Sequence, residues 1–149
     1  VEWANFYHIT KELVLDADVS FSHAEFRGDD PAGREIPGAI ESVVAAGLTY
    51  QSERGFFGSL RLRYFGPRPL IEDNSFRSGE TILLGAQVGY RFNDRWTVSA
   101  DIFNLLDRRD HDIDYAYESR VRPGDDVMMQ THFHPVEPIQ ARFMVSARF

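Results

Sequence analysis

Three histidines and their neighbouring carboxylates are the residues whose types and spacing could bind a metal. His132 and His134 lie two residues apart, so an extended backbone would project both imidazoles to the same side. With His111, Asp112 or Asp114 they would offer the nitrogen and oxygen ligands that zinc and related metals take. Histidines in an outer loop are usually only solvated, however, and we expect no metal site and no cofactor.

Acid–base catalysis is the other chemistry that these side chains could perform. Glu118 and Asp125 could be combined with His132 as acid and base, but any acidic loop offers as much. The chain contains no G-x-S-x-G elbow, no H-E-x-x-H signature, no P-loop and no dinucleotide-binding fingerprint. We therefore predict no catalytic residues and expect that the protein is not an enzyme.

Several arginines lie in segments that we expect to be loops. They could meet an anionic ligand or lipopolysaccharide, although solubility alone is a sufficient reason for charge in a loop. These residues are Arg27, Arg34, Arg68, Arg120 and Arg122. The net charge of −7 argues against a nucleic-acid partner. The sequence itself identifies no ligand-binding residue.

Composition excludes a helical membrane protein but not a membrane β-barrel. No apolar run approaches the roughly 18 residues of a spanning helix, and the best covers only residues 43–48. A spanning β-strand needs an apolar residue only at every second position, so a charged fraction of 26% does not exclude one. The absence of cysteine excludes disulfides and thiolate metal sites.

The chain ends in a strictly alternating segment, residues 139–149. Its odd positions, from Ile139 to Phe149, are apolar, and its even positions include Arg142 and Arg148. Successive side chains of a β-strand project to opposite faces, so this segment predicts a strand with one apolar and one polar face. Such a strand can face a soluble core, or it can face lipid on one side and a wet lumen on the other.

The same alternation recurs through the chain and predicts further strands at residues 13–21, 39–51, 56–66, 80–92 and 96–102. Residues 1–7 are consistent with the tail of a strand that begins upstream. After residues 104–107 the apolar parity reverses, which predicts a bulge or bend within one long strand, with a separate strand after a turn as the alternative. We therefore expect an all-β fold, an antiparallel up-and-down meander of about six to seven strands.

Loop lengths alternate along this meander. Residues 52–55 and 93–94 form tight turns, whereas residues 27–38, 67–79 and 118–135 form long polar loops. An up-and-down arrangement would place the long loops at one end and the tight turns at the other, as in outer-membrane barrels.

Aromatic residues cluster at the predicted strand ends, where two girdles would meet the membrane–water boundaries. Near the short-turn rim these are Tyr50, Phe56, Phe92, Trp96 and Phe149, and towards the loop rim they are Phe21, Tyr64, Tyr115 and Tyr117. Charged residues on the opposite parity would face a lumen, where they could line a ligand path or pair with one another. This lumen-facing set comprises Asp16, Asp18, Arg61, Arg63, Arg91, Asp101, Arg142 and Arg148.

Four segments carry a resemblance to a known family. Residues 101–107 contain Asn-Leu-Leu-Asp and are followed by Asp-Ile-Asp-Tyr at 112–115, while residues 143–149 form the alternating end of the chain. These resemble the penultimate strand, with its N-L-[FL]-D segment, and the final strand of TonB-dependent outer-membrane receptors. Residues 34–39 and 58–70 resemble other parts of the same carboxy-terminal barrel region.

The resemblance implies a 22-stranded barrel with an amino-terminal plug domain. It also implies TonB-powered uptake of a scarce ligand, such as a ferric siderophore or cobalamin, and recognition of Phe149 by the outer-membrane assembly machinery. We expect residues 1–149 to be the carboxy-terminal barrel segment of such a receptor, in the bacterial outer membrane and without a plug. Its expected partners are outer-membrane lipid or lipopolysaccharide and the remaining barrel and plug, with TonB acting only through the missing amino-terminal part.

Six strands cannot enclose a ligand channel, and they would leave two edges of unpaired backbone groups. In isolation we expect these edges to pair with another chain, or the strands to form an imperfectly closed small barrel. Two alternatives stay open, a stand-alone small outer-membrane barrel and a soluble β-barrel that binds an apolar ligand. The soluble barrel would place Leu60, Val98 and Phe143 inside and the arginines outside.

Overall fold

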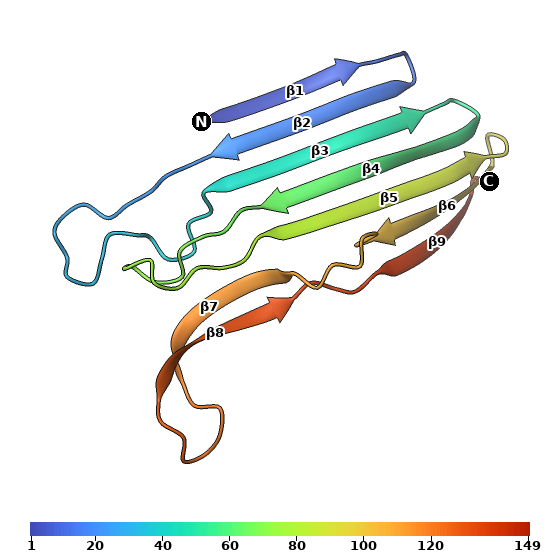
Figure 1. The fold of residues 1–149 in the computed structure, drawn as a ribbon. Coiled ribbons are helices and arrows are strands. Elements are labelled where there is room, and N and C mark those ends of the chain that lie inside the picture. Colours follow the sequence, from blue (N-terminus) through green and yellow to red (C-terminus); the bar gives the residue numbers. More distant parts are fainter.

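The computed structural model describes residues 1–149, which form nine β-strands and no helix (Figure 1). No helix is therefore present that could be long and apolar enough to span a membrane. The strands are β1 (Glu2–His8), β2 (Leu13–Phe21), β3 (Ser42–Gln51), β4 (Gly55–Phe65), β5 (Thr81–Arg91), β6 (Trp96–Phe103), β7 (His111–Ser119), β8 (Met128–Pro135) and β9 (Gln140–Ala147).

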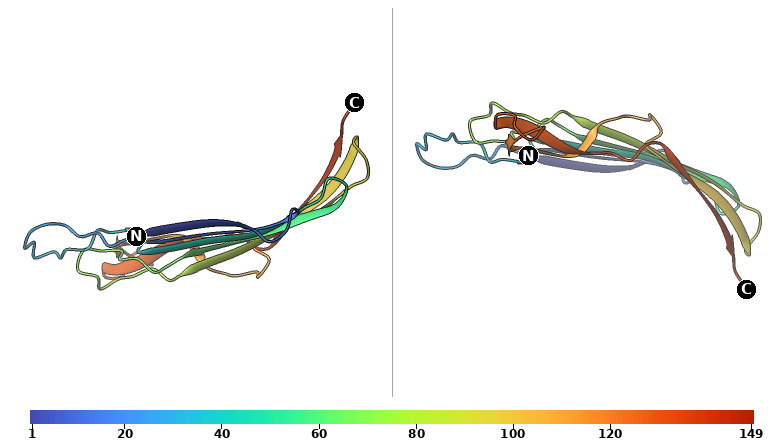
Figure 2. Two further views of the ribbon diagram at one scale, coloured as in Figure 1. Left: turned by 90° about the horizontal axis from the view of Figure 1, so that it is seen from above. Right: turned by 90° about the horizontal axis from the view of Figure 1, so that it is seen from below.

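Seven of the strands form one open antiparallel sheet in the order β1-β2-β3-β4-β5-β6-β9. Strands β7 and β8 form a separate hairpin, inserted between β6 and β9. The views in Figure 2 show an extended, curved sheet whose first and last strands do not meet. The predicted all-β antiparallel meander is confirmed, and it is open at β1 and β9.

The sheet does not enclose a dry core. Only 11 of the 149 residues are buried, and Leu70, in a loop, is the one large hydrophobic side chain among them. Phe143 and Val145 on β9 are 79% and 65% exposed. This excludes the soluble barrel with an apolar interior as the fold of this chain, because Val98, Ile113 and Val145 do not gather in a closed centre.

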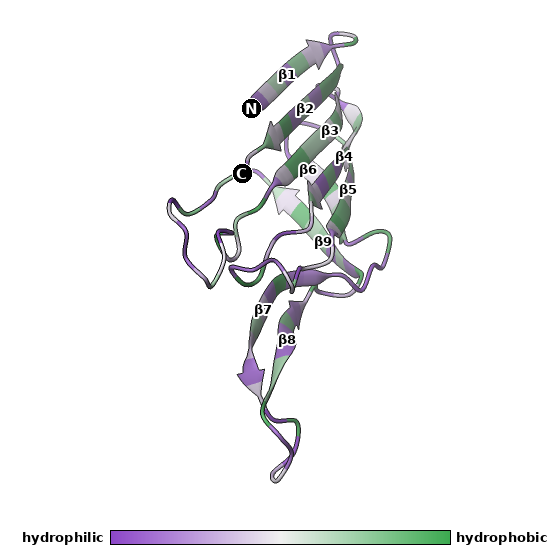
Figure 3. Cartoon of the chain, turned by 60° about the vertical axis from the view of Figure 1, so that its left-hand side comes forward, coloured by the Kyte–Doolittle hydropathy of each residue, from purple (hydrophilic) through white to green (hydrophobic).

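The strand register gives the sheet one apolar and one polar face. Leu15 pairs with Leu48, Leu48 with Leu60, and Leu60 with Ala86, so one apolar row crosses four strands. The neighbouring row, displaced by one residue, contains Asp16 and other polar positions on the opposite face. Figure 3 shows the resulting alternation of hydrophobic and hydrophilic bands along the strands.

Long connections and tight turns lie at opposite ends of the sheet, as Figure 1 shows. The connections at residues 22–41 and 66–80 and the β7–β8 hairpin emerge at one end. The short turns at residues 9–12, 52–54 and 92–95 emerge at the other end, where the carboxy-terminus also lies.

Two local predictions need correction. The parity reversal after Asn104 marks a turn followed by the separate strand β7, rather than a bulge within one long strand, so the alternative prediction holds. The predicted loop at 118–135 is wrong over its second half, because Met128–Pro135 forms β8. This strand lacks apolar alternation and pairs antiparallel with β7. Ring stacking adds to the pairing, with His132 on Tyr117 at a centroid distance of 4.0 Å and Phe133 on His111 at 3.6 Å.

Smaller boundary differences occur near the amino-terminus. Residues 2–8, predicted as the tail of a strand that begins upstream, form strand β1 and pair with β2 along their whole length. Strand β3 begins at Ser42 rather than at residue 39.

Candidate functional site on the polar face of the sheet

An ion pair crosses three strands on the polar face. Asp16 on β2, Gly47 on β3 and Arg61 on β4 are aligned by the register. The Arg61 Nη1 donates to Asp16 Oδ2 at 2.6 Å, and Nη2 lies 3.4 Å from the hydroxyl of Thr49. A Cβ at position 47 would meet both the guanidinium and the carboxylate, so the missing side chain of Gly47 makes room for the pair.

The neighbouring row of paired residues on this face has the same two charges, but an alanine takes the place of Gly47 between them. Asp18, Ala45 and Arg63 are aligned in the same way, but Asp18 and Arg63 form no ion pair. Arg63 borders a hollow of about 650 Å³ on the polar face, which Arg61, Asp101 and His134 also line. The polar face thus combines one closed ion pair with an arginine, Arg63, that has no acidic partner.

Other charged groups on this face contact residues close to them in the sheet. Asp101 on β6 accepts the side-chain N–H of Gln87 at 2.7 Å, and Arg142, its neighbour on β9, lies over the ring of Phe103 at 5.3 Å. Arg91 donates to a backbone oxygen at the β3–β4 turn at 2.6 Å. These bonds satisfy the charges locally and leave their side chains on one side of the sheet.

The opposite face is apolar and carries aromatic residues near the short turns. Phe56, Tyr90 and Phe92 contact one another edge to face, with centroid distances of 4.8 Å for both pairs. Phe56 and Phe92 are 65% and 62% exposed. An exposed apolar face backed by a charged face is the arrangement of a sheet that separates two different environments.

Comparison with known proteins identifies the family. Residues 2–105 match the family model described as TonB dependent receptor-like, beta-barrel. The chain belongs to this family. No curated protein sequence gives a significant match.

Two solved receptor structures share the fold. The ferric yersiniabactin uptake receptor FyuA from Yersinia pestis superimposes with a TM-score of 0.71 and 19% identity, over 99% of this chain and 23% of FyuA. A mutant of the ferric enterobactin receptor PfeA from Pseudomonas aeruginosa gives a TM-score of 0.53 and 11% identity, over 72% of this chain and 16% of PfeA. The chain therefore spans less than a quarter of the length of these receptors.

Within this segment of receptor barrel, the predicted polar set falls on one face. Seven of its residues lie in strands and share the polar side through the register, namely Asp16, Asp18, Arg61, Arg63, Arg91, Asp101 and Arg142. Arg148 follows the end of β9, and its backbone N–H bonds to the oxygen of Arg95. The structure brings Asp16 and Arg61 together but leaves Arg63 without an acidic partner.

The aromatic residues divide between the sheet and the hairpin. Tyr50, Phe56, Tyr64 and Trp96 lie on the apolar face of the receptor sheet, and Phe92 follows β5 at the short-turn end. Tyr115 and Tyr117 lie instead on β7, outside the sheet, because the chain turns away at Asn104.

The histidines are dispersed along the hairpin rather than gathered at one point. His132 stacks on Tyr117, His134 meets Tyr115 edge to face, and His111 Nδ1 lies 2.6 Å from Asp114. No cluster of three or more histidine, aspartate or glutamate side chains suited to a metal forms.

Asn104 and Asp107 hold both ends of the hairpin, a role that we did not predict from sequence. Asn104 has a φ of 48°, and its buried amide donates at 2.9 Å to the backbone oxygens of Arg108 and Glu137. Its Oδ1 accepts the N–H of Arg108, and the Asp107 carboxylate accepts the N–H of Ile139 at 3.2 Å. The Asn-Leu-Leu-Asp segment was the available signal for this function.

The Asp110 carboxylate accepts a backbone hydrogen bond at the start of β5, where no neighbouring strand is present to accept it. Strand β6 pairs only with residues 86–91, and the Asp110 carboxylate accepts the otherwise unpaired N–H of Ile82 at 2.8 Å. It also accepts the Nε–H of Arg108 at 2.8 Å. Burial acts to raise the pKa of Asp110, but the hydrogen bonds from Arg108 and Ile82 outweigh burial and hold this pKa below its ordinary value.

Proposed function

We propose that this chain is the carboxy-terminal part of the wall of an outer-membrane receptor, which takes up a scarce ligand such as a ferric siderophore or cobalamin with energy delivered through TonB. The observation that carries the proposal is the open seven-stranded sheet with an exposed apolar face and a charged opposite face. The apolar face would contact lipid, and the face of Asp16 and Arg61 would line the lumen.

The two open edges support a place within a larger barrel. Strands β1 and β9 each have a neighbour on one side only, so half of their backbone groups lack ladder partners. Such groups are very costly in hydrocarbon, and closure into a barrel removes the edges. The remaining strands of the receptor would pair with β1 and β9, and isolated copies would self-associate through the same edges.

The sheet has too few strands to form a transport channel by itself. About eight strands make a barrel that its own side chains fill, so seven strands cannot surround a path for a siderophore. Transport therefore requires the other strands and a plug, and coupling to TonB would reside in those parts.

The orientation of the two faces can be tested with single cysteines, because the chain has none of its own. Thr97 and Val98 are adjacent on β6 and project to opposite faces. In the assembled receptor, a fluorophore on Val98→Cys should be quenched by spin-labelled lipid, whereas Thr97→Cys should react with a membrane-impermeant charged maleimide. The reverse pattern, or equal aqueous reactivity at both positions, would overturn the proposal.

A further inference from the structure

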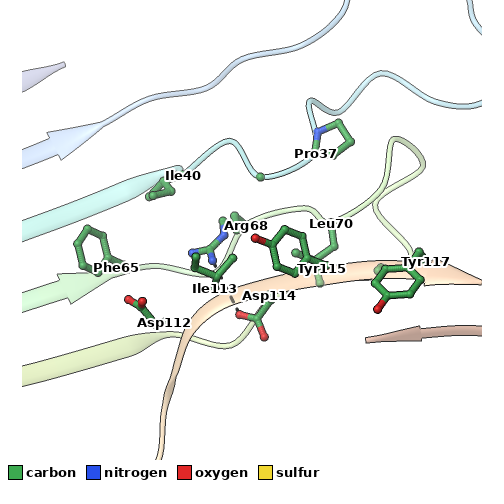
Figure 4. Close-up of a pocket in the computed structure, with 12 residues that line it drawn as sticks. Pro37, Ile40, Phe65, Arg68, Leu70, Asp112, Ile113, Asp114, Tyr115 and Tyr117 are labelled. Atoms are coloured by element: carbon green, nitrogen blue, oxygen red, sulfur yellow. Dashed lines mark ion pairs between the residues drawn. The ribbon is translucent and has the colours of Figure 1, made fainter. Parts of the chain in front are cut away.

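A hollow of about 510 Å³ lies between the hairpin and the loops at the long-connection end of the sheet (Figure 4). Strand β7 forms one wall, and the connections before β3 and after β4 form the other. Most of the lining is apolar or aromatic and includes Ile40, Phe65, Leu70, Ile113, Tyr115 and Tyr117. The volume is within the range of sites that bind small organic molecules.

One guanidinium, that of Arg68, lies in this mostly apolar lining, which also contains the carboxylates of Asp112 and Asp114. The Arg68 side chain is only 9% exposed, and its guanidinium donates no hydrogen bond within the chain. Its backbone is fixed, since Arg68 N–H donates to Ser78 Oγ at 3.0 Å and Ser78 N–H donates to Arg68 O at 2.9 Å. Arg68 is therefore held at the hollow with its donors unused.

The nearest carboxylate does not satisfy Arg68. Asp114 Oδ2 lies 3.9 Å from Arg68 Nη2, beyond hydrogen-bond distance, and Figure 4 marks this ion pair by a dashed line. The other oxygen of Asp114 is bound to His111 Nδ1 at 2.6 Å. No buried side-chain nitrogen or oxygen lacks a hydrogen-bond partner, so the unpaired nitrogens of Arg68 reach the open space of the hollow. An oxygen acceptor that enters the hollow would complete their hydrogen bonds.

The geometry of arginine narrows the choice of acceptor. A planar guanidinium presents two parallel N–H groups that match the two oxygens of a carboxylate. Asp112 also lines the hollow, and its negative charge disfavours a ligand with several negative charges. Tyr115, 47% exposed, offers a flat aromatic surface, and Leu70 lines the same hollow as an apolar contact for the body of the ligand (Figure 4).

We propose that this hollow binds a small aromatic monocarboxylate, with the carboxylate on the Arg68 guanidinium and the ring between Tyr115 and Leu70. The proposal concerns binding at the outer rim and goes beyond the proposed function, since it does not require that this ligand be transported. Among the loop arginines, which could meet an anion or serve solubility alone, it selects Arg68, whose side chain is only 9% exposed and donates no hydrogen bond within the chain.

The test uses the whole membrane protein that carries this chain, in lipid vesicles, with 4-(trifluoromethyl)benzoate and its neutral amide as matched probes. Fluorine NMR line broadening measures the affinity of each probe, and protein-free vesicles give the background. We expect saturable benzoate binding that is about tenfold tighter than amide binding. Equal affinity for the two probes in the unaltered protein would overturn the proposal.

Variants locate the site. Arg68→Gln should weaken benzoate binding about tenfold and leave amide binding unchanged, whereas Arg122→Gln, at the exposed hairpin tip, should change neither. Tyr115→Ala removes an exposed side chain and should weaken both probes. If Arg68→Gln does not fold, the comparison of the two probes and the Tyr115→Ala variant still test the proposal. Benzoate binding that neither Arg68→Gln nor Tyr115→Ala weakens would overturn it.

Discussion

Asp16 on β2 and Arg61 on β4 form an ion pair directly over Gly47 of the intervening strand β3. The pair depends on a residue that contributes no side chain at all. In the adjacent row Ala45 occupies the equivalent position, and there Asp18 and Arg63 stay apart. Over β2 to β4 the two rows have the same charges and differ by one methyl group, although on β5 the first row continues with Gly85 and the second with Leu83.

We expect Gly47→Ala to separate Asp16 from Arg61, because the new Cβ would occupy the path of the guanidinium. The coupling energy between Asp16→Asn and Arg61→Gln should fall from about 0.5–1 kcal/mol to near zero in this background. Urea unfolding of the receptor in lipid vesicles measures it. The reciprocal change Ala45→Gly should create coupling between Asp18 and Arg63, and an unchanged Asp16–Arg61 coupling in Gly47→Ala would contradict this account.

Asn104→Ala should destabilise the protein by about 2–3 kcal/mol, because three hydrogen bonds at a buried site are lost and alanine disfavours a positive φ. Asn104→Gly removes the same bonds but accepts the backbone conformation, so it should recover about 1 kcal/mol. Thermal unfolding gives both values, and limited proteolysis reports release of the hairpin. Equal stability of the two variants would show that the backbone conformation contributes nothing.

Low pH should weaken the hydrogen bonds that Asp110 makes just before β7, at the base of the β7–β8 hairpin. Because the pKa of Asp110 is lowered in the folded protein, its charged form contributes stability at pH values above the ordinary aspartate pKa, near ~4. That contribution is lost as the pH falls through the lowered folded pKa. Hydrogen exchange at Ile82 should therefore accelerate at low pH. Asp110→Asn should already exchange faster at neutral pH and should show a much smaller pH dependence, and an identical profile would exclude Asp110 as the cause.

Removal of Phe149 should reduce the amount of assembled receptor several-fold without changing the stability of molecules that do assemble. Phe149 lies beyond β9 and is fully exposed within this chain, so it makes no packing contribution to this sheet. We propose, as the family resemblance implies, that the assembly machinery recognises it. Heat-modifiable electrophoretic mobility measures the assembled fraction. Phe26→Ala, at an exposed loop aromatic, is the control, and an equal loss in both variants would argue against a specific signal.

The sequence alone determined the two-faced character of the strands. Alternation is a local property with a period of two, so Asp16 and Leu15 must project to opposite sides whichever strand lies beside them. The lengths of the connections likewise fixed which end of the sheet carries the long loops. For the same reason the alternating end of the chain, residues 139–149, was correctly assigned to a strand, observed as Gln140–Ala147.

Only the tertiary structure decided which strands are neighbours and which side chains are buried. Strand β9 pairs with β6 rather than with β7, because Asn104 and Asp107 turn the intervening segment out of the sheet. Nothing in the local pattern of Met128–Pro135 predicts a strand, because the segment lacks apolar alternation and its strand form depends on pairing with β7. The burial of Arg68 likewise depends on loops and a hairpin that are distant in sequence. Such contacts are long-range, and a periodic pattern carries no information about them.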